Sequence, residues 1–225
     1  MPAPGPTPPA AAPSRAGPGA RSGGRQVGRR AVLAAPLLLI PGGTRARPAE
    51  LRFRVVRNGS VIGTHRVAFA EAGEVLTART EVDITVKVLG ITAFRYAHRF
   101  EEVWARDRLR SATSRRDRNG TVTELRARAQ EGAVLVEGSA GRFHLPAEAA
   151  PLSWWDSRRF TRPLFDNDTG TPLQLRWTRR ALPGGGSLWQ ASGGEESEGT
   201  YAADGTWTGW KTRAEDGSTV LYEPA

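Results

Sequence analysis

The chain has 225 residues and a formal net charge of +9, with 30 arginines but only two lysines. The first 46 residues hold six arginines and no acidic residue, so residues 47–225 carry 26 basic against 23 acidic side chains, a near balance that argues against a nucleic-acid-binding protein. Cysteine is absent, which excludes disulfides, thiolate nucleophiles, cysteine-ligated zinc and iron–sulfur clusters. We therefore expect a core that is held by packing alone.

The N-terminal part predicts a leader. Residues 1–26 consist almost entirely of Pro, Ala, Gly, Ser and Arg, a composition that cannot bury enough apolar surface to fold. The apolar run from Ala31 to Ile40 contains Pro36 and is far shorter than the roughly 20 residues that a helix needs to cross a bilayer. A short apolar run behind basic residues and ahead of small ones is typical of an export signal. Residues 1–46 are therefore expected to be a disordered leader plus signal peptide.

The stretch Gly28–Leu33 resembles the twin-arginine export motif, because an arginine pair precedes one free position and two apolar residues. Small residues stand three and one positions before the bond between Ala46 and Arg47, where we expect the signal to be cut. Arg45, beside this bond, favours the twin-arginine route over the general secretory route, which stays as the alternative. The sequence thus predicts a periplasmic or secreted protein with a single β-rich domain over residues 47–225.

From Glu50 onward apolar and polar residues alternate with a period of two, and turn dipeptides separate the runs. Asn-Gly and Asp-Gly accept the positive φ angles that two-residue hairpin turns need. The sequence predicts an all-β fold, a long antiparallel meander that forms a curved sheet or open barrel. The turn pairs are Asn58-Gly59, Asn119-Gly120, Asp204-Gly205 and Asp216-Gly217. A first hairpin is expected within 51–69, on both sides of Asn58-Gly59, and further strands over 75–88, 91–104, 109–115, 121–129, 133–137, 141–145, 173–178, 188–191, 199–203, 207–213 and 219–223.

In the first predicted hairpin, Asn58-Gly59 forms the turn and Val55 lies opposite Ile62. Beyond Gly63 the apolar set His65, Val67 and Phe69 would, in this register, face the side of the sheet opposite to Ile62. A β-bulge at Gly63 would bring both apolar sets to one face of the sheet.

The longest predicted hairpin joins Val75–Val88 to Ile91–Trp104. Its two strands each have an apolar face, and a two-residue turn would set each apolar face against the partner's polar one. We therefore expect an odd-length turn, Val88-Leu89-Gly90, with Gly90 in the left-handed conformation. This register pairs Ile84 with Phe94, Val82 with Tyr96, Thr80 with His98 and Ala78 with Phe100, which makes an aromatic wall.

Residues 147–160 break the alternation and predict one short helical segment or a structured loop that leaves the sheet. Within it "PLSWWDSRRF" carries two adjacent tryptophans, which a loop cannot easily bury on one side. We expect one of them to fill the core and the other to lie at the rim of a pocket or partner surface. The candidate ligand-binding residues are therefore Phe94, Tyr96, His98, Phe100, Trp154 and Trp155.

No metal site, cofactor or catalytic residue is predicted. The histidines form no ligand pair at helical spacing, and His98 is expected to be a core residue bonded to a neighbour such as Thr80, with a general base as the alternative. The stretch "FDNDTGTPLQLRW" has Asp166 and Asp168 at the spacing of a calcium loop, but it lacks the glycine at position six and the glutamate at position twelve. A polar turn before a strand is expected there instead.

The segment Arg106–Arg128 holds eight arginines and three acidic residues on what should be one hairpin. Two interpretations stay open. The arginines form either the solvated outer face of the sheet or a contact with anionic lipid headgroups at a membrane surface.

Five stretches spread over residues 51–224 resemble an uncharacterised family of exported bacterial proteins, a domain of unknown function. They are "LRFRVVRNGSVIGTHRVAF", "ITAFRYAHRFEEVW", "PLSWWDSRRF", "LFDNDTG" and "WTGWKTRAEDGSTVLYEP". The resemblance implies no activity and no catalytic residues. The meander is also similar, in architecture alone, to periplasmic lipoprotein-carrier folds, whose curved sheets hold acyl chains.

Two functions fit these features. The first is a non-enzymatic envelope protein that binds a hydrophobic ligand, such as a lipid, or a partner segment on the curved sheet. The second is a secreted hydrolase that uses carboxylates among Glu101, Glu102, Asp156 and Asp166, whose separation the sequence does not give. The export signal and the aromatic wall favour binding over enzymatic activity.

Overall fold

The structure is a computed structural model that describes residues 47–194, 196–214 and 216–225. These residues belong to one unit of the chain, Thr44–Ala225. The predicted leader, the twin-arginine motif and the small residues before the cut lie outside the described residues and stay predictions. Within the described part, no helix has the length and apolar character needed to cross a membrane.

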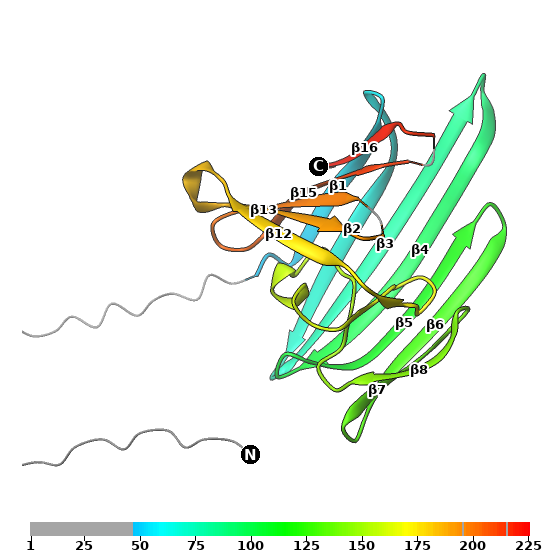
Figure 1. The fold of residues 1–225 in the computed structure, drawn as a ribbon. Helices are drawn as coiled ribbons and strands as arrows, with labels where there is room; N and C mark the ends of the chain where they lie inside the picture. The colour runs from blue at the N-terminus through cyan, green and yellow to red at the C-terminus, as the bar shows by residue number, and fades with distance from the viewer. Residues whose placement is uncertain (1–46, 195, 215) are drawn as a thin grey trace, which may run out of the picture. The chain divides into compact units, whose positions relative to one another are not determined.

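Thirteen strands form one antiparallel sheet that curves without closing into a barrel (Figure 1), which confirms the predicted all-β fold class. The order across the sheet is β12-β13-β14-β15-β16-β1-β2-β3-β4-β5-β6-β7-β8, so the chain runs as two meanders. The first comprises β1 (Glu50–Arg57), β2 (Ser60–Ala72), β3 (Val75–Val88), β4 (Ile91–Ala105), β5 (Arg108–Arg118), β6 (Thr121–Gln130), β7 (Ala133–Gly138) and β8 (Gly141–Pro146). The second comprises β12 (Arg176–Ala181), β13 (Ser187–Ser192), β14 (Ser197–Tyr201), β15 (Trp207–Arg213) and β16 (Thr219–Pro224), with a 3-10 turn at Pro183–Gly185.

The first and last strands join the two meanders. Val55 pairs with Tyr222 and Phe53 with Pro224 across the β1–β16 ladder, and the Ala225 amide donates to the carbonyl of Arg52 at 3.0 Å. The C-terminus is therefore fixed in the middle of the sheet, and the two edges of the sheet are β12 and β8.

The first hairpin has the expected bulge, one residue earlier than predicted. Val55 pairs with Gly63 and Val56 with Val61, so Ile62 is the extra residue and the predicted pairing of Val55 with Ile62 is wrong. A Cβ on Gly63 would lie 2.1 Å from the Asp83 carbonyl oxygen of β3. Glycine is required there because the neighbouring backbone comes so close.

The β3–β4 hairpin shares the predicted buried face, but its predicted turn and pairings are wrong. Ile84 pairs with Tyr96 instead of Phe94, Val82 with His98, Thr80 with Phe100 and Ala78 with Glu102. The turn is the two-residue Leu89-Gly90, and the phase is corrected by a bulge at Ala93, since Val86 pairs with Phe94 and Lys87 with Thr92. A two-residue turn and one bulge together add an odd number of residues between the paired positions. The apolar side chains of both strands therefore face the same side of the sheet, as they would with an odd-length turn.

The inner, concave face of the sheet carries the core. Val67 and Ala78 have no exposed surface, and Phe53, Phe100 and Trp104 are almost completely buried. The alternating pattern of β3 continues past this core, however, and Val88 at its end is 57% exposed.

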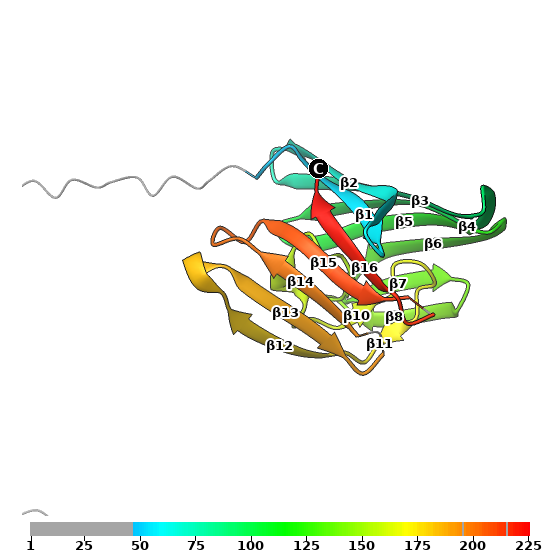
Figure 2. The same ribbon diagram turned by 90° about the horizontal axis from the view of Figure 1, so that it is seen from above.

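Residues 147–175, here called the crossing segment, run inside the curve between β8 and β12 (Figure 2). The predicted helix is reduced to one 3-10 turn at Ser157–Arg159, whose N-terminus is capped by Asp156. The predicted strand over 173–178 is divided between two sheets. Leu173 is the last residue of a short strand in a second, three-stranded sheet, whereas residues 176–178 belong to β12 of the large sheet. The strands of the second sheet are β9 (Ala150–Pro151), β10 (Leu164–Phe165) and β11 (Pro172–Leu173), with β9 and β10 parallel.

Candidate ligand-binding site

The sequence-predicted residues fall into two groups on the inner face. Tyr96, His98 and Phe100 follow one another along β4, with the His98 and Phe100 rings stacked at 5.8 Å. Phe94 precedes these residues, near the start of β4, and is half-buried under the guanidinium of Arg118. The tryptophan pair belongs to the crossing segment, where both rings contact other aromatic rings and Trp155 also contacts two arginines.

His98 is a buried core residue, as predicted, but Thr80 is the wrong partner. Its Nε2 lies 2.8 Å from Ser114 Oγ and 3.3 Å from Asp168 Oδ1. Burial lowers the pKa of His98 although the charge of Asp168 opposes the shift, so the ring is neutral at pH 7. In a catalytic triad the serine and the acid contact opposite ring nitrogens, whereas here both meet Nε2. This arrangement therefore positions a neutral histidine and does not activate a serine.

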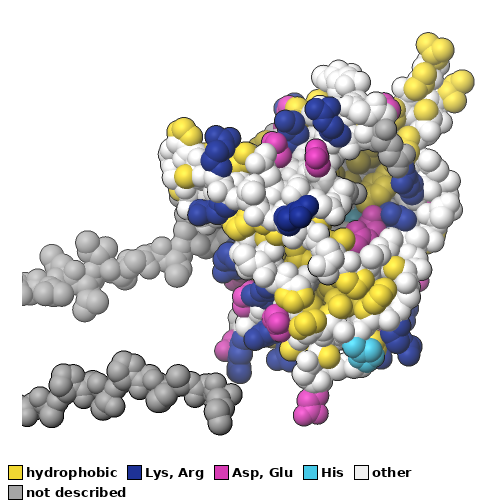
Figure 3. Space-filling view, in the orientation of Figure 1, with side chains coloured by type: hydrophobic (Ala, Val, Ile, Leu, Met, Phe, Trp, Pro, Cys, Tyr) yellow, Lys and Arg dark blue, Asp and Glu magenta, His cyan; other side chains and the backbone are white. Residues whose placement is uncertain are grey.

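Asp168 contacts side chains of two neighbouring strands, β4 and β5. Its Oδ2 accepts from Arg116 Nη1 at 3.1 Å and from the Tyr96 hydroxyl at 3.4 Å. Figure 3 shows this end of the inner face as a hollow in which histidine, acidic and basic side chains lie together. We call Tyr96, His98, Ser114, Arg116 and Asp168 the His98 network.

The "FDNDTG" stretch is a polar turn, as expected. Asp166 Oδ1 accepts from the Thr169 amide at 2.6 Å, from the Thr169 hydroxyl at 2.7 Å and from the Asp168 amide at 3.1 Å. Oδ1 of Asp166 is thus occupied within the turn. Among the described residues no group of three or more His, Asp or Glu side chains is placed to hold a metal ion.

Among the described residues, Glu102 is the most deeply buried titratable side chain, with no exposed surface. Its carboxylate accepts from Trp104 Nε1 at 2.9 Å, Trp155 Nε1 at 2.9 Å and Ser153 Oγ at 2.6 Å. Burial raises the pKa of Glu102, although Arg159, 3.9 Å away, and these donors oppose the shift. The carboxylate fixes the crossing segment to β4.

Arg159 is 3% exposed and lies between two indole rings. Its guanidinium carbon is 3.3 Å from the centroid of Trp104 and 4.4 Å from that of Trp155. The same guanidinium lies 3.3 Å from Asp156, whose pKa is pushed up by burial but falls below its ordinary value because Arg158 and Arg159 outweigh that effect. The two arginines of this cluster are thus balanced by the acidic residues Glu102 and Asp156.

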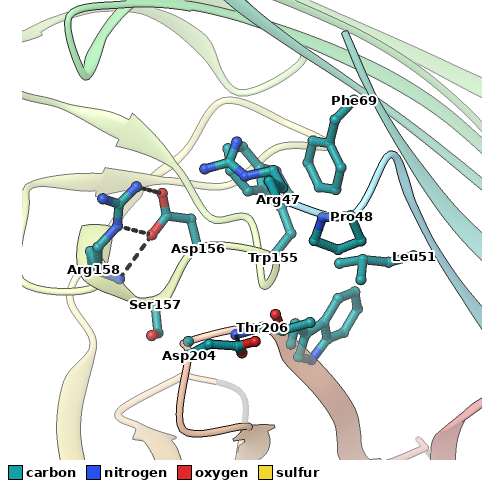
Figure 4. A pocket seen from close by; sticks show the side chains of 12 residues that line it. Arg47, Pro48, Leu51, Phe69, Trp155, Asp156, Ser157, Arg158, Asp204 and Thr206 are labelled. Carbon is teal, nitrogen blue, oxygen red and sulfur yellow. Dashed lines mark hydrogen bonds and ion pairs between the residues drawn. The ribbon is translucent and has the colours of Figure 1, made fainter. Parts of the chain in front are cut away.

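Beside this cluster lies a pocket of about 290 Å³, here called the Arg47 pocket. Apolar side chains from β1, β2, β15 and the crossing segment form much of its wall, and Figure 4 shows the Arg47 side chain lying against Trp155. The lining residues are Arg47, Pro48, Leu51, Phe69, Trp155, Asp156, Ser157, Arg158, Asp204, Gly205, Thr206 and Trp207.

The two arginines of the pocket differ in their partners. Arg158 is held by Asp156 through bonds of 2.7 and 2.8 Å. The Arg47 guanidinium lies 5.1 Å from the Phe69 centroid and 4.9 Å from that of Trp155. Arg47 Nη1 is buried, and no residue that the structure describes accepts a hydrogen bond from it. Burial lowers the pKa of Arg47, an effect that the charge of Asp156 opposes.

The two tryptophans do not divide their roles as the sequence suggested. Trp155 is 6% exposed and also lines the pocket, so one residue serves both core and rim. Trp154 is half-buried, with its ring at 5.3 to 5.7 Å from those of Phe160, Trp177 and Trp210. A Cβ on Gly199 would lie 2.8 Å from the Trp154 ring. Glycine at this position therefore leaves the space that the ring occupies.

The carboxylates proposed for a hydrolase point in different directions. Glu101 lies on the outer face, where Arg79 donates to it at 2.6 Å, whereas Glu102 is inside and inaccessible. Asp156 is 5% exposed and ion-paired, and Asp166 is used by its own turn. The structure does not bring these four to one cleft.

Several arginines of the Arg106–Arg128 segment are paired with acids. Arg106 is 2.6 Å from Glu74, Arg115 is 3.9 Å from Glu124 and Arg116 reaches inward to Asp168. These contacts reduce the free positive charge of the hairpin.

A model of the family described as "Domain of unknown function (DUF6134)" matches residues 53–225. The chain belongs to this family. A search among curated proteins found no match. The match therefore assigns a family without assigning a reaction or a ligand.

Two solved structures match this chain in the structural comparison. A β-barrel-like protein of the domain of unknown function DUF1849 from Brucella abortus has a TM-score of 0.54 at 9% identity, over 78% of this chain and 94% of that one. A DUF1089 family protein from Pseudomonas aeruginosa has a TM-score of 0.40 at 14% identity, over 79% and 94%. The first likeness shows a shared fold and nothing about function.

Sequence reasoning missed Arg47, Arg116, Arg159 and Asp168 as inner-face residues. A signal for Glu102 was present, because it falls in the same alternating phase as Phe100 and Trp104. A carboxylate in the apolar phase of a strand needs buried donors. Arg159 has no such signal, since the crossing segment has no periodicity.

Proposed function

We propose that the protein is an exported envelope protein that binds a small apolar molecule with an anionic group in the Arg47 pocket. One observation carries the proposal: a buried guanidinium nitrogen that finds no acceptor among the described residues lies beside the rings of Phe69 and Trp155. A buried donor without an acceptor is costly, so a ligand that supplies one gains affinity. An anionic oxygen is the strongest acceptor for a guanidinium.

The size and wall of the pocket limit the ligand. Its volume of about 290 Å³ is at the low end for ligand pockets, which run from about 300 to 1,000 Å³. Leu51, Phe69 and Trp207 provide apolar wall for a ring or a short acyl chain. A short acyl chain that ends in a carboxylate supplies both an apolar group for this wall and an acceptor for Arg47. The apolar ligand that the sequence predicted is therefore proposed to be a fatty-acid-like molecule.

The second arginine of the pocket, Arg158, engages an acid beside Arg47. Because Arg158 is already bound to Asp156, it keeps that carboxylate from pairing with Arg47. Among residues 47–194, 196–214 and 216–225, a ligand carboxylate therefore competes with no acid that is hydrogen-bonded to Arg47 Nη1.

The test compares three probes of similar length, octanoate, octan-1-ol and octylammonium, by the change in tryptophan fluorescence of the purified protein. We expect octanoate to bind at least about tenfold more tightly than the alcohol, because hydrogen bonds to charged groups contribute about 1.5–3 kcal/mol. Octylammonium should bind most weakly. Equal affinity for the three probes, or no binding of octanoate, would overturn the proposal.

Arg47→Gln should remove the preference for octanoate over octan-1-ol and leave the binding of the alcohol nearly unchanged. Arg126→Gln is the matched control, since Arg126 is exposed on β6. If both variants bind octanoate like the wild type, the acceptor site is not at Arg47.

A further inference from the structure

The tip of the β3–β4 hairpin is apolar and exposed. Val88 is 57%, Leu89 97% and Ile91 73% exposed, and Figure 3 shows hydrophobic side chains on this projecting tip. An exposed cluster of large apolar side chains marks a contact surface more often than a single exposed residue does.

This tip has no strand beside it. β2 pairs with β3 only from Val75 to Ile84, and β5 pairs with β4 only from Tyr96 to Ala105. Residues 85–94 are therefore a two-stranded arm whose outer edges carry no ladder with the other described strands, and the sheet gives Leu89 nothing to pack against (Figure 1). Arg95 lies at the base of this arm, where its backbone amide and carbonyl are hydrogen-bonded to Asn119.

The turn itself argues that Leu89 serves something outside the fold. Four two-residue turns hold a non-glycine first residue in the left-handed region, with φ of 49° at Asn58, 51° at Leu89, 51° at Arg106 and 54° at Asn119, and in all but the Arg106 turn a glycine at positive φ follows. Asparagine tolerates this left-handed region, whereas a leucine there is strained. Two of these turns have the favoured asparagine, the Arg106 turn has a charged residue, and the Leu89 turn alone has an exposed apolar one. Folding alone would favour asparagine at position 89.

The charges around the tip indicate the kind of partner. Between Asp83 and Glu101 the chain has Lys87, Arg95 and Arg99 and no acidic residue. Arg99 is bound to Asp83 at the base of the arm, which leaves Lys87 and Arg95 as the cations behind the apolar tip. Apolar side chains ahead of basic ones match the interface of an anionic bilayer, where acyl chains lie beneath negative headgroups.

We propose that the tip Val88, Leu89 and Ile91 inserts into the headgroup region of an anionic lipid bilayer while Lys87 and Arg95 contact the headgroups. Exposed Val61 and Val122 follow the Asn58 and Asn119 turns at the same end of the sheet. Phe69 of the Arg47 pocket lies at the other end of these strands, so this contact does not depend on the proposed ligand.

The test is co-sedimentation with vesicles of equal parts phosphatidylglycerol and phosphatidylcholine, compared with phosphatidylcholine alone. The wild type should bind the anionic vesicles more tightly, and added salt should weaken binding. Leu89→Asn should weaken it by about tenfold or more, since removing a leucine side chain from water is worth about that factor. The same change should raise the melting temperature, which shows that lost binding is not unfolding.

Val75→Asn is the matched control, because Val75 is an exposed valine at the other end of β3. The chain has no cysteine, so Leu89→Cys and Val75→Cys can each carry a single environment-sensitive dye. The dye at position 89 should shift to the blue on anionic vesicles and the dye at 75 should not. A wild type that binds neither vesicle, or a Leu89→Asn variant that binds within twofold of it, would overturn the proposal. Octanoate binding should be unchanged in Leu89→Asn, so the two proposals fail separately.

Discussion

Trp155 donates its indole N–H to the carboxylate of Glu102 across 2.9 Å, and Glu102 has no exposed surface. This bond ties the crossing segment to the inner face of β4 and fixes the ring that lines the Arg47 pocket. A buried carboxylate that accepts from two indoles and a serine is expensive to remove, because every donor then loses its acceptor.

Glu102→Ala should lower the free energy of unfolding by about 3–5 kcal/mol, because it also leaves Arg159 as a buried cation with one acid fewer. Glu102→Gln keeps acceptor oxygen and shape, and should cost less. Urea unfolding measures both. The neighbouring Glu101→Ala is the control, since its exposed pair with Arg79 should be worth at most about 1 kcal/mol. Equal losses at 101 and 102 would contradict the assigned role of Glu102.

The tryptophan pair should respond unequally to truncation. Trp155→Ala removes a ring with 6% exposure and should cost about 3–5 kcal/mol, whereas half-buried Trp154→Ala should cost roughly 1–3 kcal/mol. Only Trp155→Ala should also reduce octanoate binding, because Trp155 lines the pocket. Denaturant unfolding and the probe titration together check this, and a larger binding defect in Trp154→Ala would place the ligand elsewhere.

Stability should fall between pH 7 and pH 5 partly because of His65. Burial, with a smaller effect of His98, lowers the pKa of His65 to about 3. The folded protein then binds fewer protons than the unfolded chain between about pH 3 and 6.5, so this stabilisation is complete above pH 6.5 and is lost on acidification. At pH 5 the expected loss is about 1–2 kcal/mol, from about 1.4 kcal/mol for each pH unit in that window.

His65→Phe should remove this part of the pH dependence, since a phenylalanine fits among the rings of Phe53, Trp207 and Tyr222 and does not titrate. Burial raises the pKa of Glu102 and acts in the opposite sense, so the informative quantity is the difference between variant and wild type. Urea midpoints at pH 7 and pH 5 give that difference. Parallel losses in the two proteins would rule out His65 as the source.

Export should yield a mature chain that begins at Arg47, which would place a residue of the proposed binding pocket at its N-terminus. N-terminal sequencing of the secreted protein checks the cut, and a product that still carries Ala31–Ile40 would contradict it. Replacing both arginines of the pair at 29 and 30 by lysine should block export by the twin-arginine route. Unimpaired export would favour the general secretory route.

The strands were predictable from the sequence because alternation and turn dipeptides are local signals. The β3–β4 register was not, since Leu89-Gly90 with a bulge at Ala93 and a three-residue turn give the same facing pattern. The choice depends on a leucine at positive φ, which turn statistics disfavour.

Long-range pairings escaped prediction for a different reason. The β1–β16 ladder joins residues at opposite ends of the domain, and no local pattern indicates it. The parallel β9–β10 pair has two residues a strand, too few to show a period. The Arg47 pocket depends on both, because it collects residues from β1, β15 and the crossing segment.

The central claim is that an apolar anion binds in the Arg47 pocket, and the most direct measurement is the indole N–H spectrum of the ¹⁵N-labelled protein during titration with octanoate. Trp155 and Trp207 line the pocket and have their indole N–H groups bound to Glu102 and to the Gly209 carbonyl, so their signals should be sharp and should shift. Trp189, which packs against Phe160 and Trp177, should stay in place. Unchanged Trp155 and Trp207 signals at saturating octanoate, or shifts confined to other tryptophans, would contradict the claim.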